Sequence, residues 1–383
     1  MREIELVRLK KEDFHDVVNL LNTVFAVQNG QEMDFESIFP RIFVPKDETM
    51  GWHLGAKNDG KLCGVAASYP LTYRVGGNDL KISAGGNVAV DITMRGRGIM
   101  QSILHKLDEE DRTDGFDISY LHGNRFRYRN FGYERCGVEY YFTLTRQMLG
   151  KDAPKRQFKY VDLRMAEEEF VKKVFDFYNT QSTFLLRDYD SFMPALKAKN
   201  RLPLAVLSEK KEMIAYFVVG MDDCYISEIF VKDEMLFSDV IKGYMEQFDT
   251  AKLFLGMPAY DPLVKQAQKK ADRYHVMQPG NFKIFNFKRV VESFMREKSL
   301  HEFMPDGNIT IDSEVFGAWS IEKTGVKICV EPYVGNAQYI LPGYTAYPFL
   351  FGTLIPQVSS KSYEDEMLLK AWFPLPLYCP YLT

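Results

Sequence analysis

A short glycine-rich segment is the part of the sequence best suited to bind a charged ligand. It starts with the apolar residues Val88-Ala-Val90 and continues through Arg95-Gly-Arg-Gly98. It then enters a stretch with apolar residues at helical spacing, namely Ile99, Met100, Ile103, Leu104 and Leu107. This order predicts a strand, a loop and a helix. Because the first turn of a helix has unpaired backbone N–H groups at the positive end of the helix dipole, the loop predicts an anion site that suits a diphosphate.

The spacing of the loop excludes two common phosphate-binding motifs. A P-loop requires Lys and then Ser or Thr after its second glycine, whereas Ile99 and Met100 follow Gly98. A dinucleotide-binding fingerprint requires a third glycine where Gln101 stands. The remaining pattern, Arg-x-x-Gly with a further glycine inside it, resembles the coenzyme A loop of the GNAT acetyltransferases. The alternative is a glycine-rich turn that only connects a strand to a helix.

A second motif follows the next predicted strand, Ile118–Leu121. The residues run Asn124-Arg-Phe-Arg-Tyr-Arg-Asn-Phe-Gly-Tyr133, with Tyr128 three positions before the Phe-Gly-Tyr element. GNAT enzymes are similar here, since an aromatic residue commonly precedes Phe-Gly-Phe or Phe-Gly-Tyr by three positions. The glycine loop and this motif together are more specific than either alone. The alternative for Tyr128 is a packing residue with its hydroxyl at the surface.

Composition restricts the class of protein. A chain of 383 residues is long enough for two or three domains, and 46% hydrophobic residues suffice for several cores. The formal net charge of −4 argues against general nucleic-acid binding. The five cysteines are scattered and the six histidines form no ligand spacing, so we expect no disulfide framework and no metal.

The sequence also leads to an expectation about where in the cell the protein is located. The first residues, Met1-Arg-Glu-Ile-Glu-Leu6, lack the apolar core of a signal peptide. No stretch approaches ~18 uncharged apolar residues, so no membrane span is expected. Unpaired cysteines are typical of a reducing compartment, and we expect a cytoplasmic protein.

Residues 1–150 are predicted to form a first mixed α/β domain. Ile4–Arg8 predicts a strand and Phe14–Phe25 a helix. Two strands, Gly51–Lys57 and Lys61–Tyr69, flank the hairpin turn Asn58-Asp-Gly60. Lys81–Val90 predicts a third strand, in which Gly85-Gly86 indicates a bulge or a close backbone approach. After the glycine loop, its helix and the motif around Tyr128, the strand Val138–Thr145 is expected to close this domain.

Residues 151–290 are predicted to repeat the same order of elements. A charged, proline-containing linker, Lys151–Gln157, precedes them. Pro203–Leu207 and Met213–Val219 predict a hairpin, Tyr225–Val231 a further strand, and Phe282–Phe287 a closing strand. The loop after Val231 contains Asp233 and Glu234 and no glycine, and carboxylates would repel a diphosphate. The second copy is therefore expected to bind no coenzyme.

Residues 291–383 are predicted to form a third, small α/β domain. Ile309–Ile311, Ala318–Ile321 and Val326–Val330 predict antiparallel strands, and the aromatic-rich stretch Tyr339–Leu354 is expected to be helical. No charged side chain occurs after Lys370. Because chain ends are usually polar, this apolar end is expected to pack inside the protein, on its own domain or at an oligomer interface.

The whole chain resembles the enhanced-intracellular-survival acetyltransferase family. The resemblance consists of two tandem GNAT-like units, the second without a coenzyme loop, followed by a domain of sterol-carrier type. It implies an α/β fold of tandem acyl-CoA N-acyltransferase domains and acetyl-CoA as cosubstrate. It also implies a primary amine of an aminoglycoside, a polyamine or a lysine side chain as acceptor, and a homo-oligomer, commonly a hexamer.

The resemblance also assigns a site, residue by residue. The strand Val88, Ala89 and Val90 would pair with the pantetheine amides, and Gly123 and Asn124 would lie beside the thioester. Tyr128 would be the general acid, and the α-carboxylate of Thr383 the general base. The diphosphate would be held by Arg95, Gly96, Arg97, Gly98, Ile99, Met100 and Gln101.

Ordinary chemistry supports these roles. Attack by an amine on a thioester needs a neutral amine and a proton for the leaving thiolate, and a protonated tyrosine can supply that proton. Two other functions stay open: transfer of a longer acyl or an aminoacyl group on a similar scaffold, and a non-catalytic protein that binds an apolar ligand. The acidic and aromatic stretch Gln31–Phe43 is either a wall for a cationic amine or a solvated amphipathic segment.

Overall fold

The computed structural model describes residues 4–150, 157–354 and 362–380 of the chain. Its fold is mixed α/β, as the sequence predicts. The contacts divide it into two compact units. The first consists of Met1–Cys136, Thr183–Leu186 and Gly280–Cys379, and the second of Gly137–Ser182, Arg187–Pro279 and Pro380–Thr383. Within the described ranges, no helix has both the length and the apolar character needed to cross a membrane.

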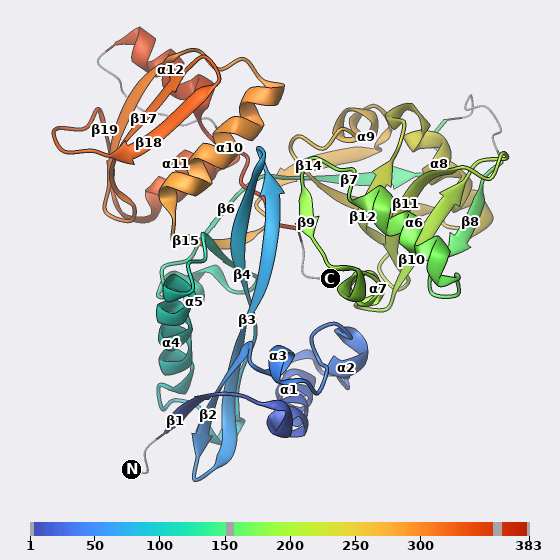
Figure 1. Ribbon diagram of the computed structural model, residues 1–383, viewed down its shortest axis with the longest axis horizontal. Coiled ribbons are helices and arrows are strands. Elements are labelled where there is room, and N and C mark those ends of the chain that lie inside the picture. The colour runs from blue at the N-terminus through green and yellow to red at the C-terminus, as the bar shows by residue number, and fades with distance from the viewer. Residues whose placement is uncertain (1–3, 151–156, 355–361, 381–383) are drawn as a thin grey trace. The chain divides into compact units, whose positions relative to one another are not determined.

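The first unit is built on a twisted sheet with the strand order β1-β2-β3-β4-β5-β15-β6, and β9 pairs with β3. The long hairpin of β3 and β4 is its spine (Figure 1). The predicted turn joins β2 to β3, with Asn58 opposite Lys61. The strand bounds are Glu5–Arg8 (β1), His53–Asn58 (β2), Lys61–Val75 (β3), Asn78–Val90 (β4), Ile118–Leu121 (β5), Glu134–Cys136 (β6), Phe184–Leu186 (β9) and Gly280–Ile284 (β15).

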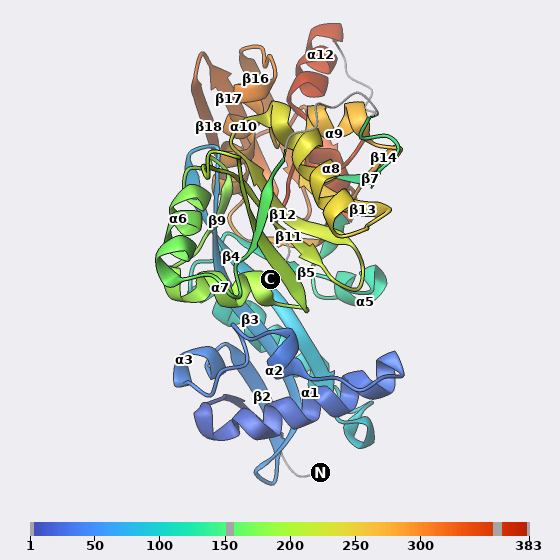
Figure 2. The ribbon, with the colours of Figure 1, turned by 90° about the vertical axis from the view of Figure 1, so that its right-hand side faces the viewer.

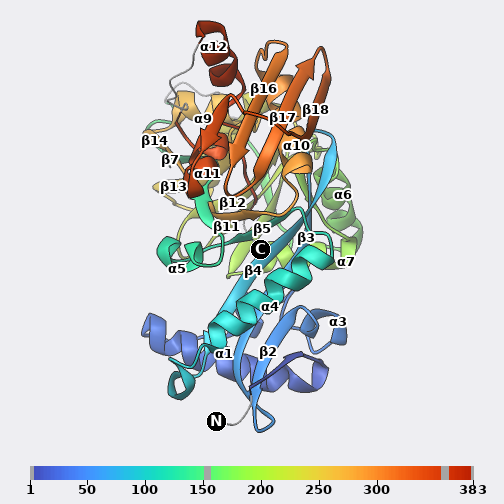
Figure 3. The same cartoon turned by 90° about the vertical axis from the view of Figure 1, so that its left-hand side faces the viewer.

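Helices lie on either side of β3 and β4 (Figures 1 and 3). The helix α4 buries the apolar residues that the sequence places at helical spacing, and they pack with Ala66 and Leu121 of the sheet. Five helices and two 3₁₀ turns are described in this part of the chain: Lys11–Asp13 (η1), Phe14–Asn29 (α1), Phe35–Ile38 (α2), Asp47–Met50 (α3), Ile92–Met94 (η2), Ile99–Thr113 (α4) and Arg125–Arg129 (α5).

The C-terminal part of the first unit carries a second, smaller sheet in the order β18-β17-β16-β19. The three predicted strands are confirmed as an antiparallel set, whereas β19 is parallel to β16. The elements are Phe287–His301 (α10), Gly307–Ser313 (β16), Gly317–Thr324 (β17), Lys327–Pro332 (β18), Tyr339–Leu341 (β19), Gly343–Thr345 (η4), Ala346–Phe351 (α11) and Tyr363–Trp372 (α12).

Two expectations for this part have different outcomes. The stretch Tyr339–Leu354 is helical only in α11 and begins with a strand, because buried Tyr339 and Leu341 alternate with exposed Ile340. The expectation of a packed chain end is confirmed up to Cys379. Leu377, Tyr378 and Cys379 are buried in the core that also holds Trp372.

The second unit is built on a sheet with the strand order β14-β7-β13-β12-β11-β10-β8. The helices α6 and α7 lie on one face, and α8 and α9 on the other (Figure 2). The bounds are Glu139–Thr145 (β7), Lys159–Asp162 (β8), Glu168–Tyr178 (α6), Tyr189–Lys197 (α7), Arg201–Leu207 (β10), Met213–Gly220 (β11), Tyr225–Val231 (β12), Glu234–Leu236 (η3), Phe237–Gln247 (α8), Lys252–Pro258 (β13), Val264–Lys270 (α9) and Arg273–Met277 (β14).

The two large sheets exchange one strand each. Val138–Thr145 was expected to close the first sheet, but β7 lies between β13 and β14 of the second. Phe282–Phe287 was expected to close the second sheet, but β15 lies between β5 and β6 of the first. The two assignments are wrong because both strands are antiparallel to their neighbours, and their local pattern does not specify which sheet they join. The division at residues 150 and 290 stays a prediction.

Candidate functional site

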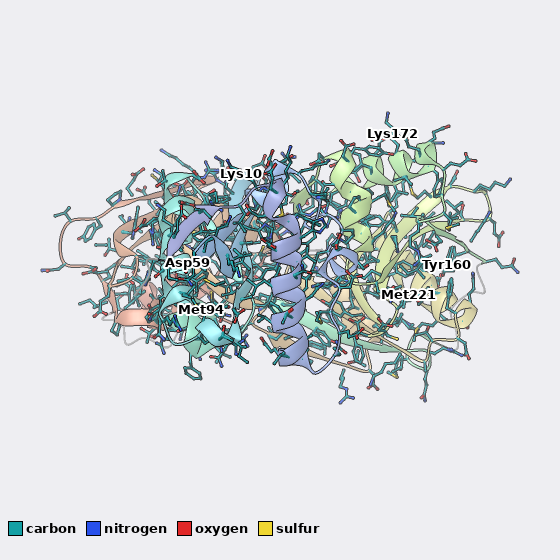
Figure 4. All side chains as sticks on the ribbon, turned by 90° about the horizontal axis from the view of Figure 1, so that it is seen from below. Lys10, Asp59, Met94, Tyr160, Lys172 and Met221 are labelled. Atoms are coloured by element: carbon teal, nitrogen blue, oxygen red, sulfur yellow. The ribbon has the colours of Figure 1, made fainter. Side chains whose placement is uncertain are left out.

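The glycine loop connects β4 to α4 and takes a conformation that its two glycines permit. Gly96 has a φ of 78° and Gly98 a φ of 77°. Only glycine adopts such angles without strain. Before them, Asp91 accepts hydrogen bonds from the backbone N–H and the hydroxyl of Thr93, at 2.8 and 2.6 Å. Met94 and the β2–β3 turn at Asp59 lie at the same end of the first unit (Figure 4).

The loop leaves the start of α4 open. Gly98 is the N-terminal cap of the helix, and no side chain of the described residues caps it. The first turn contains no acidic residue, and Arg95, Arg97 and Gln101 are exposed around it. An uncapped helix start beside two arginines attracts a diphosphate through its N–H groups and its dipole.

The strand before the loop has an open edge. β4 runs parallel to β5 and, among the described residues, pairs with it only at Ile82, Ser83 and Ala84. Beyond Ala84 the two strands diverge, while β4 continues to Val90 along its other neighbour, β3. The edge of Val88–Val90 that faces away from β3 is therefore available to pair with the amides of an extended ligand.

A bulge interrupts β4 where the strands diverge. The register with β3 shifts between Val65 and Ala67, and Asn87 has a φ of 55°. A Cβ on Gly86 would come within 3.0 Å of the Tyr69 ring, which explains the glycine at this position. Asn87 donates a hydrogen bond to the Tyr69 hydroxyl. The predicted bulge is confirmed, and such bulges commonly redirect a strand at a site.

Tyr128 lies on α5, beside this open edge. Its ring packs in the cluster that also contains Leu121 and Ile103, against which Val88 and Val90 pack. Only 7% of the residue is exposed, and burial raises the pKa of its hydroxyl. The phenol is therefore protonated at neutral pH, as a proton donor must be.

The residues before Tyr128 fix its helix. Gly123 has a φ of 128°, and a Cβ there would lie 2.8 Å from Cε2 of Tyr128, so a larger residue would displace the ring. Asn124 begins the helix and accepts a hydrogen bond from the backbone N–H of Arg127 at 3.0 Å. The structure thus brings Gly123, Asn124 and Tyr128 together with the Val88–Val90 strand. Thr383, the other predicted catalytic residue, lies outside the described residues.

A buried polar network next to Val88 was not predicted. Ser68 and Ser83 donate hydrogen bonds to the two carboxylate oxygens of Asp111, at 2.6 and 2.5 Å. Ser119 contacts the Tyr133 hydroxyl at 2.7 Å and donates to the Ser83 carbonyl oxygen at 3.2 Å. Burial raises the pKa of Asp111. The sequence contains one indication that Asp111 is buried: it follows Ile103 and Leu107 at four-residue spacing, on the buried face of α4.

This network forms the floor of a small cavity at the divergence of the strands. The cavity holds about 20 Å³, which is room for about one water-sized group. Its apolar part is lined by Gly85, Gly86, Val88, Leu104 and Leu121.

The expected acceptor region divides into buried rings and exposed carboxylates. Phe35 and Phe43 are buried, with their ring centroids 5.4 Å apart. Glu32, Asp34 and Glu36 are exposed, and Asp34 accepts a hydrogen bond from the Ser37 backbone N–H. The carboxylates thus match the solvated alternative, whereas the rings are packed among themselves. No cluster of His, Cys, Asp and Glu suited to a metal ion occurs in the described ranges.

The second unit has a parallel strand pair of the same kind, but no glycine directly precedes its helix α8, and the first turn of α8 contains the acidic residue Asp239. β12 pairs with β13 only at Tyr225 and Ile226 among the described residues, and its register with β11 shifts beside Val219. In the following turn, Asp233 accepts a hydrogen bond from the Met235 backbone N–H at 3.0 Å. Asp91 makes the equivalent contact before α4, so the second unit differs by its lack of glycine and by the acidic residues Glu234 and Asp239 at the helix start.

Comparisons with known proteins agree with this geometry. Residues 5–136 match the family model described as the acetyltransferase (GNAT) domain. No curated protein matches the chain. Among solved structures, the GCN5-related N-acetyltransferase of Kribbella flavida shares 16% identity at a TM-score of 0.67, covering 97% of this chain and 96% of that one.

Two further solved structures share the fold along nearly the whole chain. The GCN5-related N-acetyltransferase of Anabaena variabilis has 13% identity and a TM-score of 0.68, and the match covers 99% of this chain and 98% of that one. Eis1 of Mycobacterium abscessus has 13% identity and a TM-score of 0.65, and the match covers 96% of each chain. Over residues 5–136 the chain is thus similar to the GNAT acetyltransferase domain, and along nearly its whole length it shares the fold of these structures.

Proposed function

We propose that the protein is an acetyl-CoA-dependent N-acetyltransferase that acts on a primary amine. The observation that carries the proposal is the continuity of one surface. It runs from the uncapped start of α4, along the open edge of Val88–Val90, to the buried hydroxyl of Tyr128. Acetyl-CoA has a diphosphate, amides and a thioester in the same order.

Each part of the cosubstrate has a proposed partner. The diphosphate binds the N–H groups of the loop and of the first turn of α4, between Arg95 and Gln101. The pantetheine amides pair with the β4 edge as an added strand. The thioester then lies beside Gly123 and Asn124, and a backbone N–H near Val90 stabilises the oxyanion.

The reaction is a direct attack. The neutral amine nitrogen adds to the thioester carbonyl carbon, and the tetrahedral intermediate expels the thiolate. Tyr128 gives its proton to the sulfur, and solvent restores that proton. The ammonium proton of the intermediate passes to the α-carboxylate of Thr383, the proposed base. The products are an amide and free coenzyme A.

The size of the small cavity favours acetyl over a longer acyl group. It lies against Gly85, Gly86 and Val88, where the strands diverge, and its 20 Å³ suit a methyl group. Acceptor, hexameric assembly and cytoplasmic location stay predictions from the resemblance.

Replacement of Tyr128 tests the proposal. Tyr128→Phe should lower kcat at least ~100-fold, because general acid catalysis contributes about that much, while the affinity for acetyl-CoA changes little. Turnover is measured as coenzyme A release with a panel of polyamines, aminoglycosides and lysine peptides. Tyr363→Phe, which removes a hydroxyl from an exposed tyrosine, is the matched control. Full activity of Tyr128→Phe would exclude its role as the acid.

Extension of the chain tests the proposed base. One glycine added after Thr383 moves the α-carboxylate by ~3.5 Å and leaves every side chain unchanged. We expect kcat to fall at least ~100-fold, and the loss to diminish at high pH, where the amine is already neutral. An unchanged pH profile of kcat would remove the α-carboxylate from the mechanism.

A further inference from the structure

The first unit contains a large cavity that the proposed acetyl transfer does not use. It holds about 900 Å³, at the upper end of the range of small-molecule sites. Four parts of the chain form it: the outer face of α4, the residues Asn130–Gly132 after α5, the end of β15 with the residues after it, and the small C-terminal sheet with the neighbouring η4 and α11.

One wall of the cavity is aromatic. The ring of Phe287 lies 5.0 Å from that of Phe316 and 5.2 Å from that of Trp319, at 32° in each case. Phe316 in turn contacts Tyr347, at 4.8 Å. Phe316 and Trp319 are only partly buried, although both belong to the apolar side of the small sheet. Aromatic faces left open toward a cavity favour a flat apolar ligand.

The opposite wall carries more positive than negative charge. Lys283 and Arg112 both pair with the single carboxylate of Asp108, Arg112 through its Nε, 3.2 Å from Oδ2. Burial lowers the pKa of Lys283, while Asp108 opposes that shift. The guanidinium of Arg112 lies 4.7 Å from the centre of the Phe285 ring and stays half exposed. Two cations that share one carboxylate leave a positive charge for a ligand.

We propose that this cavity binds a planar aromatic anion, of which aromatic carboxylates and sulfonates are examples. The ring would stack on the wall of Phe316 and Trp319, and the anionic group would pair with Arg112 and Lys283. An alkyl chain fits less well, since polar side chains such as Asn130, Asn286 and His105 also line the space. A cationic ligand would meet two cations on the polar wall.

The rim of the cavity carries a carboxylate that opposes such a ligand. Glu314 lines the cavity and accepts a hydrogen bond from the Gly343 backbone N–H at 3.0 Å. Its negative charge repels an anion, and a glutamine retains the accepting oxygen without the charge. Arg112→Gln and Glu314→Gln should therefore change the affinity in opposite directions.

The test uses two fluorescent probes of nearly equal shape on the full-length protein. 8-Anilinonaphthalene-1-sulfonate is anionic, and N-phenyl-1-naphthylamine is its uncharged analogue. We expect one saturable site that prefers the anionic probe about tenfold, as one charge-assisted contact implies. Arg112→Gln should abolish the preference and leave the binding of the uncharged probe unchanged. Glu314→Gln should tighten the binding of the anionic probe two- to threefold.

The test measures probe binding and not catalytic rates, because the small cavity beside Val88 shares residues with the large one. His105, Asp108, Phe131 and Lys283 also line the small cavity beside Val88, so catalytic rates would mix two effects. Lys106→Gln removes one charge from the exposed side of the same helix and is the matched control. Equal affinity for both probes in the unmodified protein, or an unchanged affinity for the anionic probe in Arg112→Gln, would overturn the proposal.

Discussion

At the scale of single residues, Asp111 has the most demanding surroundings in the candidate site. The carboxyl is 4% exposed, and its two oxygens accept hydrogen bonds from Ser68 and Ser83. Burial raises the pKa of Asp111 above its ordinary value of 3.8, and the hydrogen bonds from the two serines offset only part of that rise. The folded state therefore binds the Asp111 proton more tightly than the unfolded state does.

The sign of this shift predicts a pH dependence of stability. Because the folded pKa is raised, the contribution of Asp111 to the free energy of unfolding is largest below pH 3.8 and falls as the pH rises through the folded pKa. Asp111→Asn should remove this fall. We expect its unfolding free energy, measured in urea from pH 4 to 7.5, to decrease less with pH than that of the unmodified protein.

An exposed aspartate on the same helix controls for the loss of a negative charge. Asp114 ends α4 and lies in solvent, so Asp114→Asn should follow the pH curve of the unmodified protein. Parallel curves for Asp111→Asn and Asp114→Asn would show that Asp111 does not titrate between the two states.

The sequence predicted Tyr128 but not Asp111, for a physical reason. Tyr128 stands at a fixed distance from Phe-Gly-Tyr along the chain, so its motif is local. Asp111 is stabilised by hydroxyls that lie 43 and 28 positions away in the chain. Only the pairing of β3 and β4 brings those serines together, and no local pattern encodes that contact.

At the scale of elements, the starts of α4 and α8 explain why one anion site is proposed. Both helices follow a strand that diverges from its parallel neighbour. Before α4 the chain reaches the helix through two glycines with positive φ, whereas no glycine directly precedes α8 and the first turn of α8 contains Asp239. The difference lies in the loop, since the strand geometry is common to both units.

Two matched glycines test the role of the loop. Gly96 and Gly77 have φ values of 78° and 75°, and neither has an atom within 4 Å of an added Cβ. Alanine at either position should cost ~1–2 kcal/mol of stability through backbone strain. Gly96→Ala should in addition weaken acetyl-CoA binding at least ~10-fold by displacing the N–H groups of the loop, as measured by calorimetry. Equal affinities of the two variants would contradict the anion site.

The elements next to the site were predictable because their signals are local. The hairpin turn at Asn58-Asp-Gly60, the bulge near Gly86 and the strand Ile118–Leu121 all follow from neighbouring residues and are confirmed. The sheet that β7 or β15 joins was not predictable, because the residues of a strand do not specify which of two sheets it pairs with. The misplaced strands left the predicted loop and the Tyr128 helix unaffected.

At the scale of the whole molecule, the strand exchange makes the first sheet depend on a strand from far along the chain. β15 lies between β5 and β6, and its Phe282 is buried in the same core as Tyr120. The core also takes Trp372 and Leu377 from the end of the chain. A fragment that ends at residue 150 lacks Phe282, Trp372 and Leu377.

Truncation tests this dependence. A fragment of residues 1–150 should expose the edges of β5 and β6 and show no cooperative unfolding transition, whereas the full chain should show one. Circular dichroism during a urea titration measures the difference. The same fragment with residues 280–380 attached through a flexible linker should recover the transition. Cooperative unfolding of the short fragment alone would contradict the requirement for β15.

The exchange also sets an order of events during synthesis. β6 ends at residue 136, and β15, which separates it from β5, ends only at residue 284. At ~5–20 residues per second a ribosome needs roughly 7–30 s to bridge that interval. For that time the nascent chain holds two strands with a missing neighbour, and the proposed coenzyme A surface rests on an incomplete sheet. Until β15 is made, the edges of β5 and β6 can pair with other chains, so they need to be shielded well before the last residue is added.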